Sequence, residues 1–265
     1  MYSKIKLGFV KKVSYICKMR ITHISDTHNK HNQITADLTG GDVIIHSGDI
    51  SSLGRKSECQ RFVNWFGNLP YKYKIFVAGN HDLSFESEVL YRKKAQYFDG
   101  TNDWDAPAVE GKPEWVTELI DNLPKGVIYL ENQSVNIDVV KIWGSPYSAR
   151  FGREWAFNVS RGEDSRELWG TIPPDANIIV THGPLFGVGD RTNGNMNVGC
   201  EDLRETIMNL EPDFHLCGHI HEGAGYVQFG KTHCINGSNL SLGYEYKNKP
   251  ITFDYNFKTK EIQFI

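Results

Sequence analysis

Seven residues of the kinds that bind metal ions lie in five short clusters, and each cluster follows an apolar segment. They are Asp26 and His28 in ISDTH, Asp49 in HSGD, Asn80 in AGNHD, His182 in VTHGP, and His219 and His221 in CGHIH. Hard oxygen ligands mixed with imidazole, without thiolate, suit manganese, iron, zinc, cobalt or nickel. Two such cations about 3.5–4 Å apart activate water and bind both reacting oxygens of a phosphoester. These residue types therefore predict a site for two divalent cations and metal-assisted hydrolysis of a phosphoester.

The spacing within the clusters allows several side chains to reach one ion. Asp26 and His28 are two residues apart after an extended segment, so both side chains can face the same side. Asp49 has two carboxylate oxygens and can bridge two cations, and Gly48 before it permits a tight turn. Taken singly, each residue is as easily a cap, a turn former or a structural histidine, although GNHD and GHIH are more specific. The ordered set favours one shared site, because polar groups at several strand ends must converge somewhere.

The elements that must position these clusters alternate between strand and helix in the first half of the chain. Strands are expected at 20–25, 42–47, 73–78, 177–181 and 213–217, and helices at 55–67, after Pro113 and near 200–209. From residue 126 onward, GVIYL, SVNID and VVKIWG predict a β-rich meander that forms a second sheet. The C-terminal tail alternates in the manner of antiparallel hairpins.

No linker divides the chain, so we expect one domain at residues 19–265, preceded by an N-terminal extension at residues 1–18. Two sheets with helices outside both are the economical way to bury these elements. We therefore expect an α/β fold, a four-layer αββα sandwich of two mixed β-sheets flanked by helices. Open α/β sheets build their sites at the carboxyl ends of strands, so the dimetal site is expected there.

Composition narrows the classes of partner and compartment. Of the 265 residues, 40% are hydrophobic, which suffices for a core, and the net charge is −3. Without a basic excess we expect no nucleic-acid partner. No apolar run reaches the roughly 18 residues of a membrane span, so we expect no membrane partner. Five cysteines, odd in number and without a CxxC pair, indicate reduced thiols and a cytoplasmic location.

The order D-x-H, G-D, G-N-H-D, H-G and G-H-x-H resembles that of the calcineurin-like metallophosphoesterase superfamily. The resemblance covers nearly the whole chain from residue 19. The stretches GNHDLSF, WGSPY and THGPLFGVGD are most similar to the small metallophosphodiesterases of the brain and fetal-brain metallophosphoesterase-domain type. The last histidine of G-H-x-H, which one paralogue of that group lacks, is present here as His221, so we expect a complete metal site.

The resemblance implies a division of the ligands between two cations. Asp26, His28, Asp49 and His221 would hold the first cation, and Asp49, Asn80, His182 and His219 the second. His81 would bind no metal and would protonate the leaving oxygen, as a metal-bridging hydroxide attacks phosphorus in line. Asp82 would orient His81, or would instead cap a helix that begins after it.

One departure from the superfamily pattern narrows the substrate class. Phosphoprotein phosphatases carry G-D-x-x-D-R-G, whereas this chain has GDISSLG, with Ser52 and Leu53 in place of the Asp and Arg. The missing Arg argues for a phosphodiesterase, and the resemblance implies small nucleotides, cyclic ones included, as substrates. Two alternatives stay open: a broad phosphomonoesterase or nuclease, and a nucleotide- or protein-binding module with little turnover.

Three segments are candidates for the substrate side of the site. Residues 145–162 carry Arg150, Arg153 and Arg161 among aromatic side chains, a mixture suited either to a nucleobase and phosphate or to an ordinary surface. Residues 183–199 are rich in Gly and Asn and form a loop beside His182. The GSN at 237–239 is expected to approach the pocket.

Overall fold

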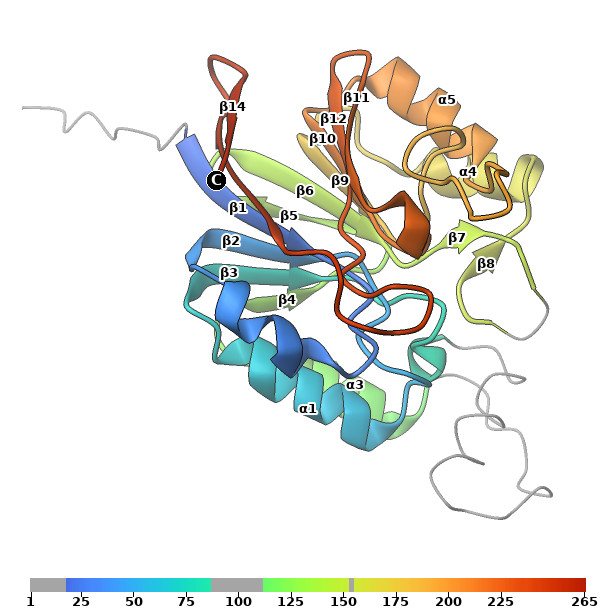
Figure 1. Cartoon of the computed structure of the whole chain (residues 1–265). Coiled ribbons are helices and arrows are strands. Elements are labelled where there is room, and N and C mark those ends of the chain that lie inside the picture. The colour runs from blue at the N-terminus through green and yellow to red at the C-terminus, as the bar shows by residue number, and fades with distance from the viewer. Residues whose placement is uncertain (1–17, 87–111, 153–154) are drawn as a thin grey trace, which may run out of the picture.

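Two six-stranded β-sheets pack face to face and enclose the central core of the protein (Figure 1). The computed structural model describes residues 18–86, 112–152 and 155–265. Val43 and Ile75 of the first sheet belong to one buried cluster with Ile178 and Leu216 of the second. Full burial of such a side chain contributes about 1.5–3 kcal/mol to the free energy of folding, so this apolar layer is the main interaction that holds the two sheets together.

The first sheet has the strand order β14-β13-β1-β2-β3-β4. Its strands are β1 (Lys18–Ile24), β2 (Gly41–His46), β3 (Tyr71–Phe76), β4 (Val127–Tyr129), β13 (Ile251–Asn256) and β14 (Glu261–Phe264). Strands β1 to β4 are parallel to one another, whereas β13 is antiparallel to β1 and to β14. The carboxyl ends of β1, β2 and β3 therefore lie side by side.

The second sheet has the order β11-β12-β10-β9-β6-β5. Its strands are β5 (Gln133–Ile137), β6 (Val140–Ser145), β9 (Ile178–Thr181), β10 (Phe214–Cys217), β11 (Gly225–Phe229) and β12 (Thr232–Asn236). The four central strands are parallel, and the edge strands β5 and β11 are antiparallel to their neighbours. A short pair, β7 (Ser148–Ala149) and β8 (Asn158–Val159), lies after β6.

Helices cover the outer faces of both sheets and complete four layers (Figure 1). On the first sheet, the rings of Phe62 and Phe66 in α1 (Lys56–Gly67) pack on Phe76 of β3. On the second, Trp169 of α4 packs on Trp143 of β6. The remaining elements are α3 (Glu114–Asp121), α4 (Glu163–Trp169), α5 (Glu201–Leu210), η1 (His31–Asp37), η2 (Leu83–Phe85) and η3 (His221–Gly223). The four-layer α/β sandwich expected from the sequence is confirmed.

One grouping expected from the sequence is wrong. Strand β4 does not form a meander with β5 and β6; it pairs parallel to β3, with Lys74 opposite Val127. The chain passes through α3 after β3 and returns to the first sheet, as parallel neighbours require a long crossover. Only β5 and β6 of the three segments join the second sheet.

Strand β1 begins at Lys18, the last residue of the expected extension. Residues 1–17 lie outside the described residues, so the extension stays a prediction. The four described cysteines are free thiols, and they are Cys59, Cys200, Cys217 and Cys234. Within the described ranges, every helix is too short or too polar to cross a membrane.

Candidate metal centre

All seven predicted ligands lie just beyond strand carboxyl ends, and the two sheets bring their loops to one edge. Asp26 and His28 follow β1, Asp49 follows β2, and Asn80 follows β3 of the first sheet. From the second sheet, His182 follows β9, and His219 and His221 follow β10. Because both sheets are mostly parallel in this region, ligands far apart in the sequence meet across the gap between the sheets.

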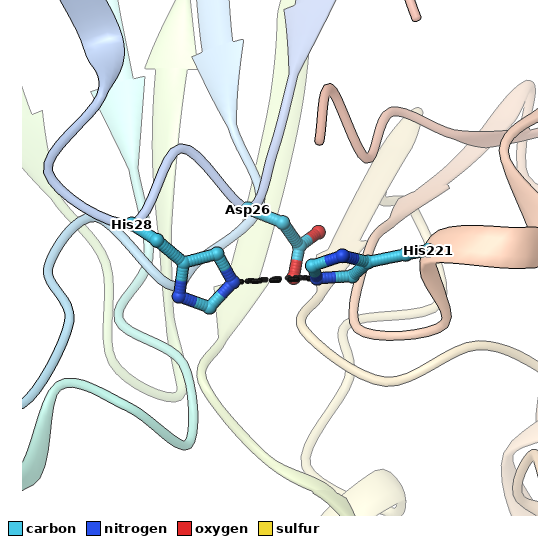
Figure 2. Close-up of side chains that lie close together, drawn as sticks. All are labelled: Asp26, His28 and His221. Atoms are coloured by element: carbon cyan, nitrogen blue, oxygen red, sulfur yellow. Dashed lines mark hydrogen bonds and ion pairs between the residues drawn. The ribbon is translucent and has the colours of Figure 1, made fainter. Parts of the chain in front are cut away.

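Asp26, His28 and His221 form one compact group, with a ligand atom of each within 4.8 Å of the others. Figure 2 shows the two imidazoles pointing toward one another beside the Asp26 carboxylate. The Nε2 atoms of His28 and His221 are 3.3 Å apart, and Asp26 Oδ1 lies 3.5 Å from His221 Nε2. Two imidazole nitrogens bound to one tetrahedral cation at about 2.0–2.1 Å are roughly 3.3 Å apart. The spacing of these donors therefore fits a divalent cation.

A second group surrounds Asp49 and His182, which join Asp26 within the same 4.8 Å limit. His182 Nε2 lies 3.5 Å from Asp49 Oδ2 and 2.8 Å from Asn80 Oδ1. Asp49 Oδ2 is also 3.6 Å from His28 Nε2, so this single oxygen stands between the two groups. The ring of His219 lies beside the second group, with its centre 5.0 Å from that of His182.

The opposite nitrogens of two of these histidines are held by backbone carbonyls. His182 Nδ1 is 2.9 Å from the carbonyl oxygen of Ser47, and His221 Nδ1 is 3.0 Å from that of Ser241. A carbonyl oxygen only accepts, so each Nδ1 must donate. A neutral ring therefore presents the Nε2 lone pair to the site, which is how proteins orient metal-binding imidazoles.

Charges within the site are strongly coupled. Burial alone would lower the pKa of His182, but the charge of Asp49 raises that pKa to about 9. For His221, burial is likewise overcome by the hydrogen bond and charge of Asp26, and the pKa rises to about 9. By contrast, burial lowers the pKa of His28 to about 3. Without metal, protons on two imidazoles balance the buried carboxylates, and binding of cations would displace those protons.

Backbone strain is concentrated at the candidate ligands. Four of them have a left-handed backbone with positive φ: Asp26 at 53°, His28 at 39°, Asp49 at 56° and His219 at 68°. Such conformations cost on the order of 1–3 kcal/mol each and persist where function demands them. Gly48 and Gly218 precede two of these residues, and close approach explains both glycines. A Cβ at Gly48 would lie 2.5 Å from His182 Nδ1, and one at Gly218 would collide with the Asp26 carboxylate.

His81 lies next to the ligands and is itself firmly held. Its backbone N–H donates to Asp49 Oδ1 at 2.8 Å, and its Nδ1 donates to the carbonyl of Ser52 at 2.8 Å. One ring nitrogen falls within 4.8 Å of ligand atoms of His28 and Asp49. The ring of Trp155 lies 4.3 Å from that of His81, centre to centre. With Nδ1 engaged, Nε2 is the nitrogen free to exchange a proton.

Asp82 acts on His81 only through the neighbouring loop. Its buried carboxylate accepts hydrogen bonds from Gly79 N at 2.8 Å, Ser51 N at 2.9 Å and Ser51 Oγ at 2.5 Å. Asp82 occupies the N-cap position of the short η2, as the helix-cap alternative expects, but its side chain makes no capping hydrogen bond there. Burial and the charge of Asp49 raise the pKa of Asp82 to about 7, against the opposing effect of Ser51. Asp82 thus fixes the loop on which Ser52 holds His81.

The three arginines expected on the substrate side differ in their surroundings. Arg161 donates to the carbonyls of Val198 at 2.8 Å and Gly199 at 3.0 Å, and to Glu201 Oε2 at 2.8 Å. These bonds use its guanidinium to hold the 183–199 loop against α5. Arg150 is exposed, and Arg153 lies outside the described residues. Substrate binding by these arginines stays a prediction.

Other residues that contact the candidate ligands come from the segment after β12. Ser238 Oγ donates to Asp26 Oδ2 at 2.8 Å, which confirms that the 237–239 segment approaches the site. Tyr244 was not anticipated, although its ring centre is 4.8 Å from that of His28. It belongs to no motif, and only the pair of tyrosines, Tyr244 and Tyr246, in a polar turn could have drawn attention to it.

Comparison with known proteins identifies the family. A family model described as calcineurin-like phosphoesterase matches residues 19–223. Metallophosphoesterase domain-containing protein 1 of Homo sapiens is 38% identical over 241 residues, which cover 89% of this chain and 70% of that protein. A UPF0046 protein of Caenorhabditis elegans is 32% identical over 235 residues, covering 89% of this chain and 74% of its own.

A solved structure supports the fold independently of close sequence similarity. The protein TT1561 of Thermus thermophilus superposes with a TM-score of 0.56 at 12% identity, over 93% of this chain and 98% of that one. At that identity the match speaks for the fold alone. The sequence matches, together with donor groups spaced for divalent cations, show that the chain belongs to the calcineurin-like phosphoesterase family and is a metal-dependent phosphoesterase.

Proposed function

We propose that this phosphoesterase hydrolyses phosphodiester bonds in small nucleotides, with His81 as the general acid. The observation that carries the proposal is the composition of the rim, where aromatic rings stand next to the candidate ligands. Trp155 lies against His81, Phe151 against His219 and Tyr244 against His28, with ring centres 4.3, 4.7 and 4.8 Å apart. Aromatic faces stack on nucleobases, at about 1–3 kcal/mol per base.

The charge of the site supports a diester over a phosphoprotein monoester. Among the described residues, no Lys or Arg side chain forms a hydrogen bond or ion pair with a candidate ligand. Ser52 and Leu53 stand where the phosphoprotein phosphatases have Asp and Arg. A diester carries one negative charge, so it needs less cationic help than a dianionic monoester.

The chain's own residues divide the chemical work. Asp26, His28, Asp49 and His221 would hold one cation, and Asp49, Asn80, His182 and His219 the other, with manganese favoured for the mixed oxygen and imidazole set. When bound, the cations supply an activated water nucleophile and neutralise negative charge on the phosphoryl group. His81 gives a proton from Nε2 to the departing oxygen, while Ser52 fixes its orientation through Nδ1. A reducing compartment such as the cytoplasm belongs to the same proposal, supported by the four free cysteines.

A metal-supplemented screen tests the proposal. Metal-stripped protein is supplied with manganese, zinc, iron, cobalt or nickel and offered bis(p-nitrophenyl) phosphate, p-nitrophenyl phosphate, and cyclic and linear nucleotides. We expect the diesters to be hydrolysed with a higher kcat/KM than the monoester, and only with added metal. Preference for the monoester would reject the diesterase assignment, and no turnover with any metal would favour a binding module.

A further inference from the structure

Two partly exposed aromatic rings stand at opposite ends of the metal centre. Tyr244 is 40% exposed, and its ring meets that of His28 edge-on at 4.8 Å and that of His221 at 5.9 Å. Phe151 is 50% exposed and lies 4.7 Å from the ring of His219. A partly exposed ring beside a metal site offers a face on which a planar group of the substrate can stack.

The backbone holds the Tyr244 ring in a defined place. Residues 240–246 form a tight turn closed by the bridge between Leu240 and Tyr246, and Tyr244 N donates to Ser241 O at 2.8 Å. The same Ser241 carbonyl orients His221, so the ring and the ligand share one support. Tyr244 has a φ of 57°, a left-handed conformation that is costly for a residue other than glycine.

Phe151 is positioned just as firmly by the β7–β8 pair. Its N–H donates to Asn158 Oδ1 at 3.1 Å, and the N–H of Arg150 donates to Val159 O at 2.9 Å. Arg161 completes this support by donating to the carbonyl of Arg150 at 3.1 Å. The backbone that carries both rings is therefore held in place before any ligand arrives, which lowers the entropy cost of binding.

The Tyr244 side opens into additional space. A pocket of about 270 Å³ lies next to His221 and is also lined by Asn193, Glu222, Ser241, Leu242, Gly243 and Lys247. Leu242 is 55% exposed there. Apolar surface, an amide and charges of both signs in one hollow suit a planar group with polar edges.

We propose, on the basis of the diesterase function proposed above, that Tyr244 and Phe151 are specificity-determining residues that each bind one ester arm of the substrate. Tyr244 takes the leaving arm: its ring is 6.3 Å from that of the proposed acid His81, while Trp155 packs on the acid itself at 4.3 Å. Phe151, on the His219 side, takes the arm that stays on phosphorus. The substrate class is then a phosphodiester with a planar group on both arms, as in a dinucleotide.

The reaction across these two arms is balanced. The oxygen of water bonds to phosphorus, the bond from phosphorus to the leaving oxygen breaks, and that oxygen takes a proton from His81; the proton that the water gives up passes through solvent and restores His81. The products are an alcohol from the Tyr244 side and a phosphomonoester beside Phe151. A cyclic mononucleotide has one base for both ester bonds and would use only one of the rings.

Two chromogenic diesters separate the roles of the two rings. Bis(p-nitrophenyl) phosphate has a ring on each arm, whereas methyl p-nitrophenyl phosphate has a ring only on the leaving arm. We expect Tyr244→Ala to raise KM about tenfold for both esters, a loss of about 1.4 kcal/mol in binding. Phe151→Ala should raise KM to a similar extent for the bis ester alone. In both variants kcat should stay within about twofold of wild type.

Control variants separate stacking from damage to the fold. Tyr244→Phe keeps the ring and should match wild type. Phe264→Ala removes a ring that is 43% exposed on β14, packed on Tyr226, and should change neither KM. Metal content and melting temperature are measured for each variant. Unchanged KM in both alanine variants, or equal effects of Phe151→Ala on the two esters, overturns the two-arm assignment while the diesterase function stands. Absence of diester hydrolysis by wild type removes both proposals.

Discussion

The metal centre has an inner half and an outer half that are supported in different ways. The inner half consists of Asn80, His182 and His219, the outer half consists of Asp26, His28 and His221, and Asp49 is shared by both. In the inner half, His182 is fully buried and its Nδ1 donates to Ser47 at the end of β2. In the outer half, His221 is 9% exposed, begins the short η3, and depends on the Ser241 carbonyl in a surface turn.

This difference implies unequal affinities for the two cations. Both halves follow strand ends of both sheets, but His182 of the inner half is held by the carbonyl of the fully buried Ser47, so this support has the stability of the core. The outer half depends on a turn that also presents Tyr244 to solvent. We therefore expect the inner cation to be retained and the outer one to exchange more readily, and that substrate contacts on the Tyr244 side influence the outer cation first.

The largest effect is expected from the residue that the two halves share. Asp49→Asn removes the charge from the oxygen that lies between His28 and His182. We expect loss of both cations and a loss of activity larger than the roughly 10²–10⁴-fold contribution of a general acid. Metal analysis per chain and kcat/KM with a diester measure this. Retention of one cation at full occupancy would show that Asp49 serves one half only.

His81→Ala should separate proton transfer from metal binding. We expect kcat to fall about 10²–10⁴-fold while the metal content of both halves stays near that of wild type. A leaving group that needs no proton, such as p-nitrophenolate, should suffer less than an alkoxide. If instead the metal content falls in parallel with activity, His81 is a ligand, as its proximity to His28 and Asp49 would allow.

Single histidine substitutions test the inequality of the two halves directly. His221→Ala should leave about one cation per chain, whereas His182→Ala should remove the tightly held one and also lower the melting temperature, because it empties a fully buried position. Chelator titration followed by metal analysis distinguishes the two. Loss of both cations in each variant would mean that the halves do not bind independently.

Much of this site was predictable because its ligands follow parallel strands. A polar residue after an apolar strand must lie at the sheet edge, so Asp26, Asp49 and His182 could be placed without knowing the strand order. The placement of β4 was not predictable. It pairs with β3 after the chain has passed through α3, and the local sequence pattern does not show which strand it will pair with. Ser241 supports His221 through its backbone carbonyl, and a carbonyl leaves no trace in the residue type.

Binding of the cations should release a proton from one imidazole in each half, His182 and His221. In the metal-free protein the pKa values of His182 and His221 are raised to about 9, so both rings are protonated at pH 7.5. Binding two cations should then release about two protons per chain from these imidazoles, on top of the proton lost by the metal-activated water, measured with a pH-sensitive dye in weak buffer. As pH rises through 9 the imidazole protons leave without metal, so their share of the release falls toward zero. His221→Ala should release one proton fewer at pH 7.5.

The smallest expected effect comes from a matched pair of serines next to the two halves. Ser238 Oγ donates to Asp26 Oδ2, so Ser238→Ala should weaken the outer cation, within the about 10–100-fold range of outer hydrogen-bond partners and near its lower end. Ser47 supports His182 through its carbonyl, while its hydroxyl bonds to His23, so Ser47→Ala keeps the support of the inner half. Competition with a fluorescent chelator measures both affinities. Only Ser238→Ala removes a hydrogen bond to a candidate ligand. Equal losses of metal affinity in the two variants would therefore indicate that each substitution loosens the whole site, and that the two halves do not depend on separate supports.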